Sequence, residues 1–161
     1  MSDGGAGGHP SGELSVVLVD DQDLPVDTAR LKEVARRTAA AEGAVGEISL
    51  LLVDAAHMAE LHAEHMGEDG PTDVLSFPVD GLVTEAPPPW APPVLVGEVV
   101  VCPAVARDQA PGGPDALPGE LDLLVAHGVL HILGHDHDTE EGAERMRERE
   151  LRHAGRSGAQ A

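Results

Sequence analysis

The chain has 161 residues, enough for one domain, and carries 29 acidic against 10 basic residues, a formal net charge of −19. Hydrophobic residues make up 42% and aromatic residues only 1%, so we expect a folded chain with an aliphatic core rather than a disordered one. No apolar run approaches the roughly 18 residues of a membrane span, and residues 1–10 do not resemble a signal peptide. The single cysteine, Cys102, excludes an internal disulfide and a zinc site with several thiolates. We therefore expect a cytoplasmic protein that does not contact a membrane.

Apolar, β-branched runs alternate with amphipathic segments along the chain. The runs predict strands at residues 14–20, 47–53, 73–79 and 95–101. Periodic apolar positions predict helices at residues 28–41, 55–66, 103–110, 120–133 and from Thr139 onward. Asp27 and Asp54 are suited to cap the first two helices. The inner face of the first helix is expected to carry Leu31, Val34, Ala35 and Thr38.

This order of elements predicts an α/β (α+β) fold, a single domain with a four-stranded mixed sheet packed by helices. The strand-helix-strand unit at the start favours parallel pairing. The short connection between the third and fourth strands suits antiparallel pairing, and Pro78 places the third strand at an edge of the sheet. The domain is expected to span residues 13–154, between loose Gly-, Ser- and Ala-rich tails at residues 1–12 and 155–161.

The most informative segment is HGVLHILGHDH, at residues 127–137. His127 and His131 are four residues apart, so they lie on one face of the predicted buried helix. Gly134 can adopt the left-handed conformation that ends a helix, and the chain can then turn back and bring His137 to the same ion. Three neutral imidazoles suit zinc, and an open fourth position would hold water, as in a catalytic site. The spacing therefore predicts one zinc ion bound by His127, His131 and His137, although iron or nickel would also suit these ligands.

Gly128 distinguishes this segment from the metzincin peptidases, whose motif H-E-x-x-H-x-x-G-x-x-H has the same spacing. It stands where those enzymes carry the glutamate that activates water for peptide hydrolysis. We therefore do not expect such a peptidase, whereas metal-assisted hydrolysis of another bond stays open. His135 does not share the spacing of the other three histidines and is interpreted as a bystander. Asp136 and Asp138 are interpreted as caps of the last helix rather than as partners of a ligand imidazole.

Three segments, in this order and spacing, resemble the signature of the YbeY family of endoribonucleases. They are PTDVLSFP at residues 71–78, VGEVVV at residues 96–101 and HGVLHILGHDH at residues 127–137. The resemblance covers about residues 14–152. It implies a mixed four-stranded sheet, one zinc ion on the three histidines, and cleavage of single-stranded RNA. It also implies roles in maturation of the 3′ end of small-subunit ribosomal RNA and in ribosome quality control, with ribosomal RNA and the ribosome or its associated proteins as partners.

Met66 is a departure from this family, because many members have an arginine at this place that is thought to aid catalysis. Its loss leaves open how phosphate charge is neutralised. His62 and His65 lie nearby in the sequence but are not equivalents, and we interpret them as surface residues without a role. Beyond the metal-bound water the sequence identifies no catalytic group, because hydrogen bonding at a strand end accounts for Thr72, Asp73 and Ser76.

The net charge argues against strong RNA binding, since nucleic-acid sites are usually basic. Arg107 is the only Lys or Arg between residues 38 and 144, and the others fall at residues 30–37 and 145–156. Each group alone is best interpreted as a solvated helix face, while both together beside the metal would supply a modest groove. We expect weak intrinsic RNA affinity and reliance on protein partners. Two functions remain, a metal-dependent endoribonuclease and, as the alternative, a non-catalytic zinc-bearing ribosome assembly factor.

Overall fold

A four-stranded mixed sheet forms the centre of the computed structural model, which describes residues 13–135 and 140–158. Its strands lie in the order β1-β2-β4-β3. They are β1 (Leu14–Asp21), β2 (Gly46–Val53), β3 (Val74–Pro78) and β4 (Leu95–Val101). Strand β2 pairs in parallel with β1 and with β4, whereas β3 pairs antiparallel with β4. The predicted sheet is confirmed, including the place of Pro78 on an edge strand.

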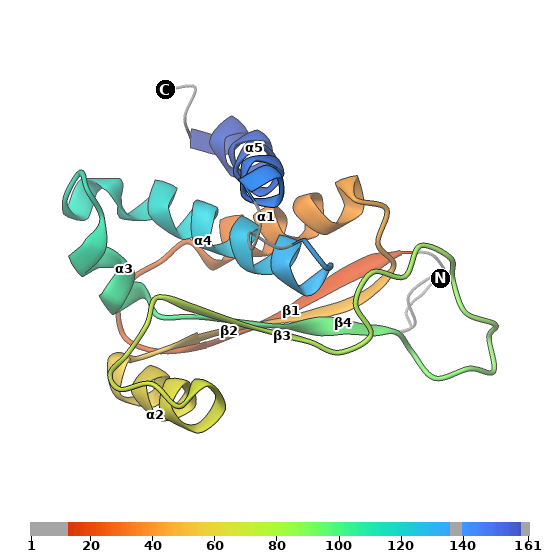
Figure 1. The fold of residues 1–161 in the computed structure, drawn as a ribbon, viewed down its shortest axis with the longest axis horizontal. Helices are drawn as coiled ribbons and strands as arrows, with labels where there is room; N and C mark the ends of the chain where they lie inside the picture. Colours follow the sequence, from red (N-terminus) through yellow and green to blue (C-terminus); the bar gives the residue numbers. More distant parts are fainter. Residues whose placement is uncertain (1–12, 136–139, 159–161) are drawn as a thin grey trace.

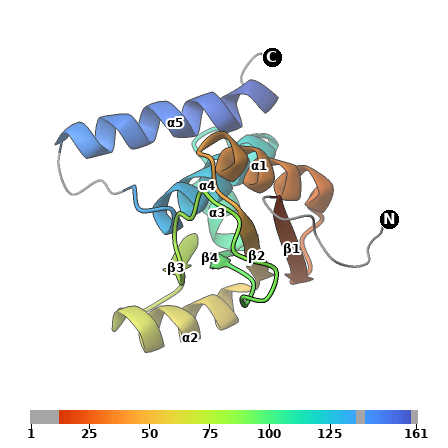
Figure 2. The same ribbon diagram turned by 90° about the vertical axis from the view of Figure 1, so that its right-hand side faces the viewer.

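The helices lie on both faces of this sheet, as Figure 1 shows. They are α1 (Thr28–Ala41), α2 (Ala55–Met66), α3 (Pro103–Gln109), α4 (Leu117–Ile132) and α5 (Glu140–Gly158), with a short 3-10 turn η1 (Pro114–Ala116) before α4. Helices α1 and α4 cover one face, α5 crosses their outer side, and α2 lies on the opposite face (Figure 2). In the part of the chain that is described, no helix is long and apolar enough to cross a membrane.

The helix ends follow local chemistry. The side chains of Asp27 and Asp54 accept hydrogen bonds from the backbone N–H groups of Arg30 and His57, at 3.1 and 2.8 Å, as capping predicts. Helix α4 begins earlier than expected, because Pro118 is tolerated in a first turn, where a backbone N–H has no partner within the helix.

The last helix differs in length from the expectation. Helix α5 continues to Gly158, into the segment predicted as a loose tail, since adding residues to an established helix costs little. The remaining tail residues, 1–12 and 159–161, lie outside the described part, so the domain boundaries stay a prediction.

Two aliphatic clusters hold the layers together. The larger one joins the sheet to α1 and α4, and its fully buried members include Val34, Ile48, Leu50, Val99 and Val129. The smaller one joins α2 to the other face through Met58, Val53, Val100, Leu75 and Cys102. Helix α4 is therefore held between the sheet and α5, and this position determines which of its side chains solvent can reach.

Candidate metal centre

Helix α4 presents two of the three predicted ligands on a single narrow stripe. From residue 120 to residue 131, the only half-buried positions are Glu120, Leu123, His127 and His131, which are three or four residues apart, and the rest are buried. The imidazole centroids of His127 and His131 lie 6.3 Å apart, with their planes tilted by 45°. The prediction that these two histidines share one face is confirmed.

Glu150 of α5 orients the ring of His127, with which its carboxylate forms a hydrogen bond through Nδ1. When Nδ1 carries the proton, Nε2 keeps its lone pair for a metal ion, as in many metal-bound histidines. The hydrogen bond and the charge of Glu150, with a smaller contribution from Asp73, raise the pKa of His127 against the opposing effect of burial. This part of the site therefore favours positive charge.

The ring of His131 offers its Nε2 as the second ligand atom, beside Nε2 of His127. Its Nδ1 is buried while the residue as a whole is half-buried, which leaves Nε2 as the nitrogen for an ion. Two imidazoles on one zinc ion, each bonded at about 2.0–2.1 Å, have centroids about 5 Å apart. The observed 6.3 Å lies close to this value, and a small side-chain rotation joins both rings to one ion. The two residues thus fit a shared metal.

Helix α4 ends in the turn that the sequence predicts at Gly134. Gly134 has a φ of 102°, as predicted for the residue that ends the helix. Its N–H donates to His131 O at 3.0 Å, and the N–H of His135 donates to Leu130 O at 3.1 Å, which together form a Schellman motif. His137 lies outside the described residues. Within the described ranges no group of three or more His, Cys, Asp or Glu side chains is arranged to hold an ion, so His137 stays a prediction.

Gly128 lies where α4 packs closely on the sheet. A Cβ atom built on it would be only 2.5 Å from Val99 Cγ1 and 3.2 Å from Ser76 Oγ. The glutamate of a metzincin could not occupy this position, which supports the interpretation that the site is not of that kind. The hydroxyl of Ser76 donates to Gly128 O at 3.4 Å, so the segment PTDVLSFP runs beside the histidine helix.

His135 takes part in a brace rather than in the metal centre. Its Nε2 forms a hydrogen bond with Glu42 Oε1 at 3.0 Å, and Arg149 Nε donates to Glu42 Oε2 at 3.2 Å. Burial would raise the pKa of Glu42, but the hydrogen bonds and charges of His135 and Arg149 together lower it. The brace joins α1 and α5 to the end of α4. The roles of Glu42 and Glu150 were not predicted from the sequence, because no spacing rule links each of them to a histidine so far away in the chain.

The place of the family arginine is an exposed end of α2. Met66 is 57% exposed there, on the helix that covers the opposite face of the sheet from α4 (Figure 1). His62 is not the idle surface residue that we expected, because its ring bonds Gly70 O at 2.8 Å and Glu68 at 3.1 Å and so holds the following loop. The ring of His65 packs against Phe77, with centroids 4.9 Å apart. Neither histidine lies on the face of the sheet that carries the candidate ligands.

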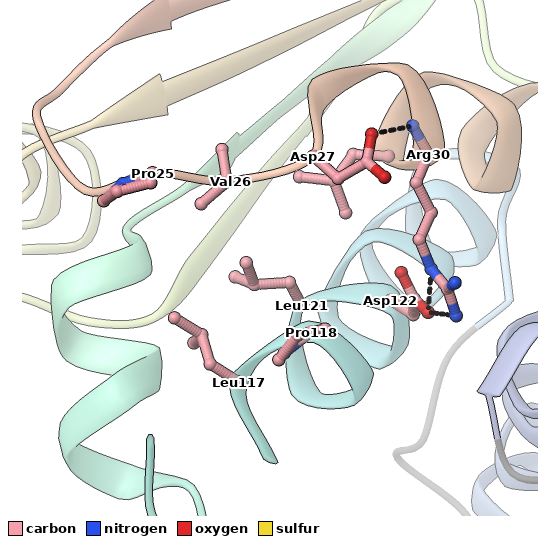
Figure 3. A pocket seen from close by; sticks show the side chains of 9 residues that line it. Pro25, Val26, Asp27, Arg30, Leu117, Pro118, Leu121 and Asp122 are labelled. Carbon is pink, nitrogen blue, oxygen red and sulfur yellow. Dashed lines mark hydrogen bonds and ion pairs between the residues drawn. The ribbon is translucent and has the colours of Figure 1, made fainter. Parts of the chain in front are cut away.

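Three arginines from the two basic groups of the sequence are paired with carboxylates. Arg30 donates to Asp122 Oδ2 at 2.8 and 2.6 Å, beside a cavity of about 340 Å³ at the start of α4 (Figure 3). Arg36 donates to Glu33, and Arg149 to Glu42, as described above. Of the four basic residues at positions 30–37, Arg30 and Arg36 are thus paired with acids.

Comparisons with known proteins agree with this architecture. The solution structure of TM1509 from Thermotoga maritima aligns with a TM-score of 0.58 over 91% of this chain and 93% of that one. The two sequences are 24% identical, so the likeness concerns the fold.

Sequence relatives extend the agreement to a family. The model of the family described as Endoribonuclease YbeY matches residues 18–157. A protein of that name from Thermobifida fusca is 44% identical over 126 residues, which cover 77% of this chain and 81% of the relative. Another from Acidothermus cellulolyticus is 44% identical over 138 residues, covering 82% and 84%. On these grounds, and in agreement with its three sequence segments, the chain belongs to the endoribonuclease YbeY family.

Proposed function

We propose that this protein is a zinc-dependent endoribonuclease that cleaves single-stranded RNA, in the maturation of the 3′ end of small-subunit ribosomal RNA and in ribosome quality control. The names of its relatives support cleavage of RNA. The paired arrangement of His127 and His131 carries the metal part of the proposal, with His137 as the third ligand. One zinc ion is the proposed cofactor.

The chain's own residues have distinct parts in this proposal. His127 and His131 bind through Nε2, and Glu150 fixes the tautomer and orientation of the first ring. A bound zinc ion lowers the pKa of water towards roughly 7 and polarises a phosphoryl oxygen. Ser76 and Gly128 keep α4 against β3 and so set the depth of the site. None of the described side chains is proposed as a separate general base.

The surroundings of the site explain why protein partners are part of the proposal. Glu120 lies on the same stripe of α4 as the two histidines, and burial together with the negative charge of Asp73 raises its pKa. The charge of Asp73 therefore reaches this stripe, where RNA phosphates would approach it. Such a field attracts a divalent cation and repels RNA phosphates. We therefore propose that the ribosome or proteins bound to it deliver the RNA.

Replacement of one ligand tests the proposal directly. His131→Ala should lose bound zinc, measured by elemental analysis of the purified protein, and should lose cleavage of a single-stranded RNA oligonucleotide. The matched control is His65→Ala, which removes an imidazole from the opposite side of the sheet and should retain both properties. Cleavage by His131→Ala at the wild-type rate would disprove the proposal.

A second candidate function is a zinc-bearing ribosome assembly factor without catalysis. Exposed Met66 in place of the family's frequent arginine, and the carboxylate partners of Arg30, Arg36 and Arg149, favour it. Incubation of wild type with and without a chelator separates the two functions. Zinc-dependent cleavage supports the nuclease, whereas binding to small ribosomal subunits without cleavage by the zinc-loaded protein supports the assembly factor.

A further inference from the structure

The connection between β3 and β4, residues 79–94, presents the only tryptophan of the chain to solvent. Trp90 is 85% exposed. The whole sequence contains one Trp, one Phe and no Tyr, so the largest apolar side chain available has been left outside the core. Tryptophan is the residue most enriched among the energetic anchors of protein interfaces, and its exposure indicates such a use.

The backbone around Trp90 is stiff. The N–H of Ala91 donates to Pro88 O at 2.9 Å and closes a turn with Pro89 and Trp90 at its tip. Prolines occupy positions 87, 88, 89, 92 and 93, and each fixes its own φ angle. A side chain presented by so rigid a loop loses little conformational entropy on binding.

Both ends of the connection are fixed to the domain. The N–H of Asp80 donates to Leu95 O and the N–H of Leu95 donates to a carboxylate oxygen of Asp80, each at 2.8 Å. Further along, the N–H of Val45 donates to Val83 O at 2.8 Å. Figure 1 shows the connection extending beyond the end of the sheet. Trp90 is therefore held out from the domain rather than folded onto it.

The charge around the connection selects the kind of partner. From residue 68 to residue 106 the sequence has six acidic residues and no Lys or Arg. Arg36 lies beside Thr84 and Ala86, but Glu33 engages its guanidinium at 2.7 Å. Aromatic platforms that stack on RNA bases work together with basic grooves, which this region does not provide among its described residues. A positively charged protein surface, by contrast, is attracted to it.

We propose that Trp90 and its proline-rich turn form a docking anchor for a positively charged protein with an apolar pocket for the indole ring. Gly81, at the start of the connection, lies against the last turn of α4, since a Cβ built on it would be 3.7 Å from Ile132 O. The bound partner would then lie at the end of the sheet where α4 carries His131. Docking through Trp90 would place RNA held by that partner near the candidate metal centre. This inference rests on the proposed function, which supplies the small ribosomal subunit as the source of the probes.

The single tryptophan provides a direct assay. Full-length protein labelled with fluorotryptophan gives one fluorine NMR signal, from Trp90 alone. It is titrated separately with the RNA-free protein fraction of small ribosomal subunits and with the protein-free ribosomal RNA. Binding of unlabelled Trp90→Ala to the protein fraction is measured alongside. The matched control is Val17→Ala, which shortens another exposed apolar side chain, on β1.

The protein fraction should shift and broaden the signal, Trp90→Ala should bind it at least about tenfold more weakly, and Val17→Ala should bind like wild type. Added salt should weaken the association. An unchanged signal, or equal binding by Trp90→Ala and wild type, would overturn the proposal. A response to the ribosomal RNA alone would replace it with base stacking. Cleavage of a free RNA oligonucleotide should be the same for Trp90→Ala and wild type, and absence of cleavage by wild type would count against the proposed nuclease and not against docking.

Discussion

Replacement of Gly128 by alanine tests how the histidine helix is seated on the sheet. Alanine is the better helix former by about 1 kcal/mol, so at an open position the change would stabilise the protein. At Gly128 the new methyl group would meet Val99 Cγ1 at 2.5 Å, and Val99 is fully buried on a central strand. Overpacking of this kind costs about 1–3 kcal/mol. Subtraction of the helix gain of about 1 kcal/mol leaves a net loss of about 0–2 kcal/mol. Because Val99 is fully buried, we expect the upper half of this range, so that Gly128→Ala is less stable than wild type by about 1–2 kcal/mol.

The same helix supplies a matched control. Gly119 has no atom within 4 Å of a Cβ built on it, so Gly119→Ala should leave stability unchanged or raise it by up to about 1 kcal/mol. Urea unfolding followed by circular dichroism gives both free energies, with equal slopes expected for the two variants. If Gly128→Ala proves as stable as Gly119→Ala, then α4 does not pack on β4 as closely as described. The position of His127 and His131 relative to the sheet would then also be wrong.

The experiment also bears on the chemistry of the site. Glu at position 128 would add a longer, charged side chain at the same crowded point, so Gly128→Glu should unfold the domain or displace α4. Introduction of the metzincin glutamate at this position is therefore not expected to produce a peptidase. The glycine is explained by packing, independently of the reaction that the metal supports.

Three further predictions concern the charged groups around α4 and the metal. Glu150→Gln should weaken zinc binding by about 10–100-fold through the loss of its negative partner for His127, measured by competition with a chelating dye. The pKa of Glu42 is lowered in the folded state from its ordinary value of 4.5, so its brace to His135 and Arg149 stabilises the fold above that pH and is lost as pH falls through the lower folded value. The stability difference between wild type and Glu42→Gln should accordingly shrink in that acidic window, and a constant difference in urea midpoints would refute it. Removal of zinc by chelation should lower the melting temperature of wild type and leave that of His131→Ala unchanged.

Most of the fold could be predicted from local sequence signals. The caps Asp27 and Asp54, the edge position of Pro78 and the turn at Gly134 each follow from the chemistry of one residue and its nearest neighbours. The hairpin between β3 and β4 followed from the length of its connection. The end of α5 did not, since the residues beyond 154 read as a tail by composition and continue the helix instead.

The candidate site was predictable only where its members share one helix. His127 and His131 meet because four residues make about one turn, a relation visible in the sequence. Glu150 reaches His127 because α5 crosses α4, as Figure 2 shows, and Glu42 reaches His135 because the end of α1 packs beside the end of α4. Such docking of helices depends on side-chain packing along their full length. The hydrogen bonds of His62 escaped prediction for a related reason, since they depend on the path of the loop after Gly67.

The charges near α4 act in opposite directions on the metal and on the RNA. Glu150 and Asp73 create a negative field at His127, which favours a divalent ion over an empty site. The same field opposes phosphates, and Arg30 and Arg149, which would offset it, donate to Asp122 and Glu42 instead. Because Arg30 and Arg149 are already paired, we expect RNA affinity to be weak and its dependence on salt concentration shallow. The chain's own charges thus favour the proposed metal ion and oppose RNA, and this is why delivery of the RNA is assigned to a protein partner.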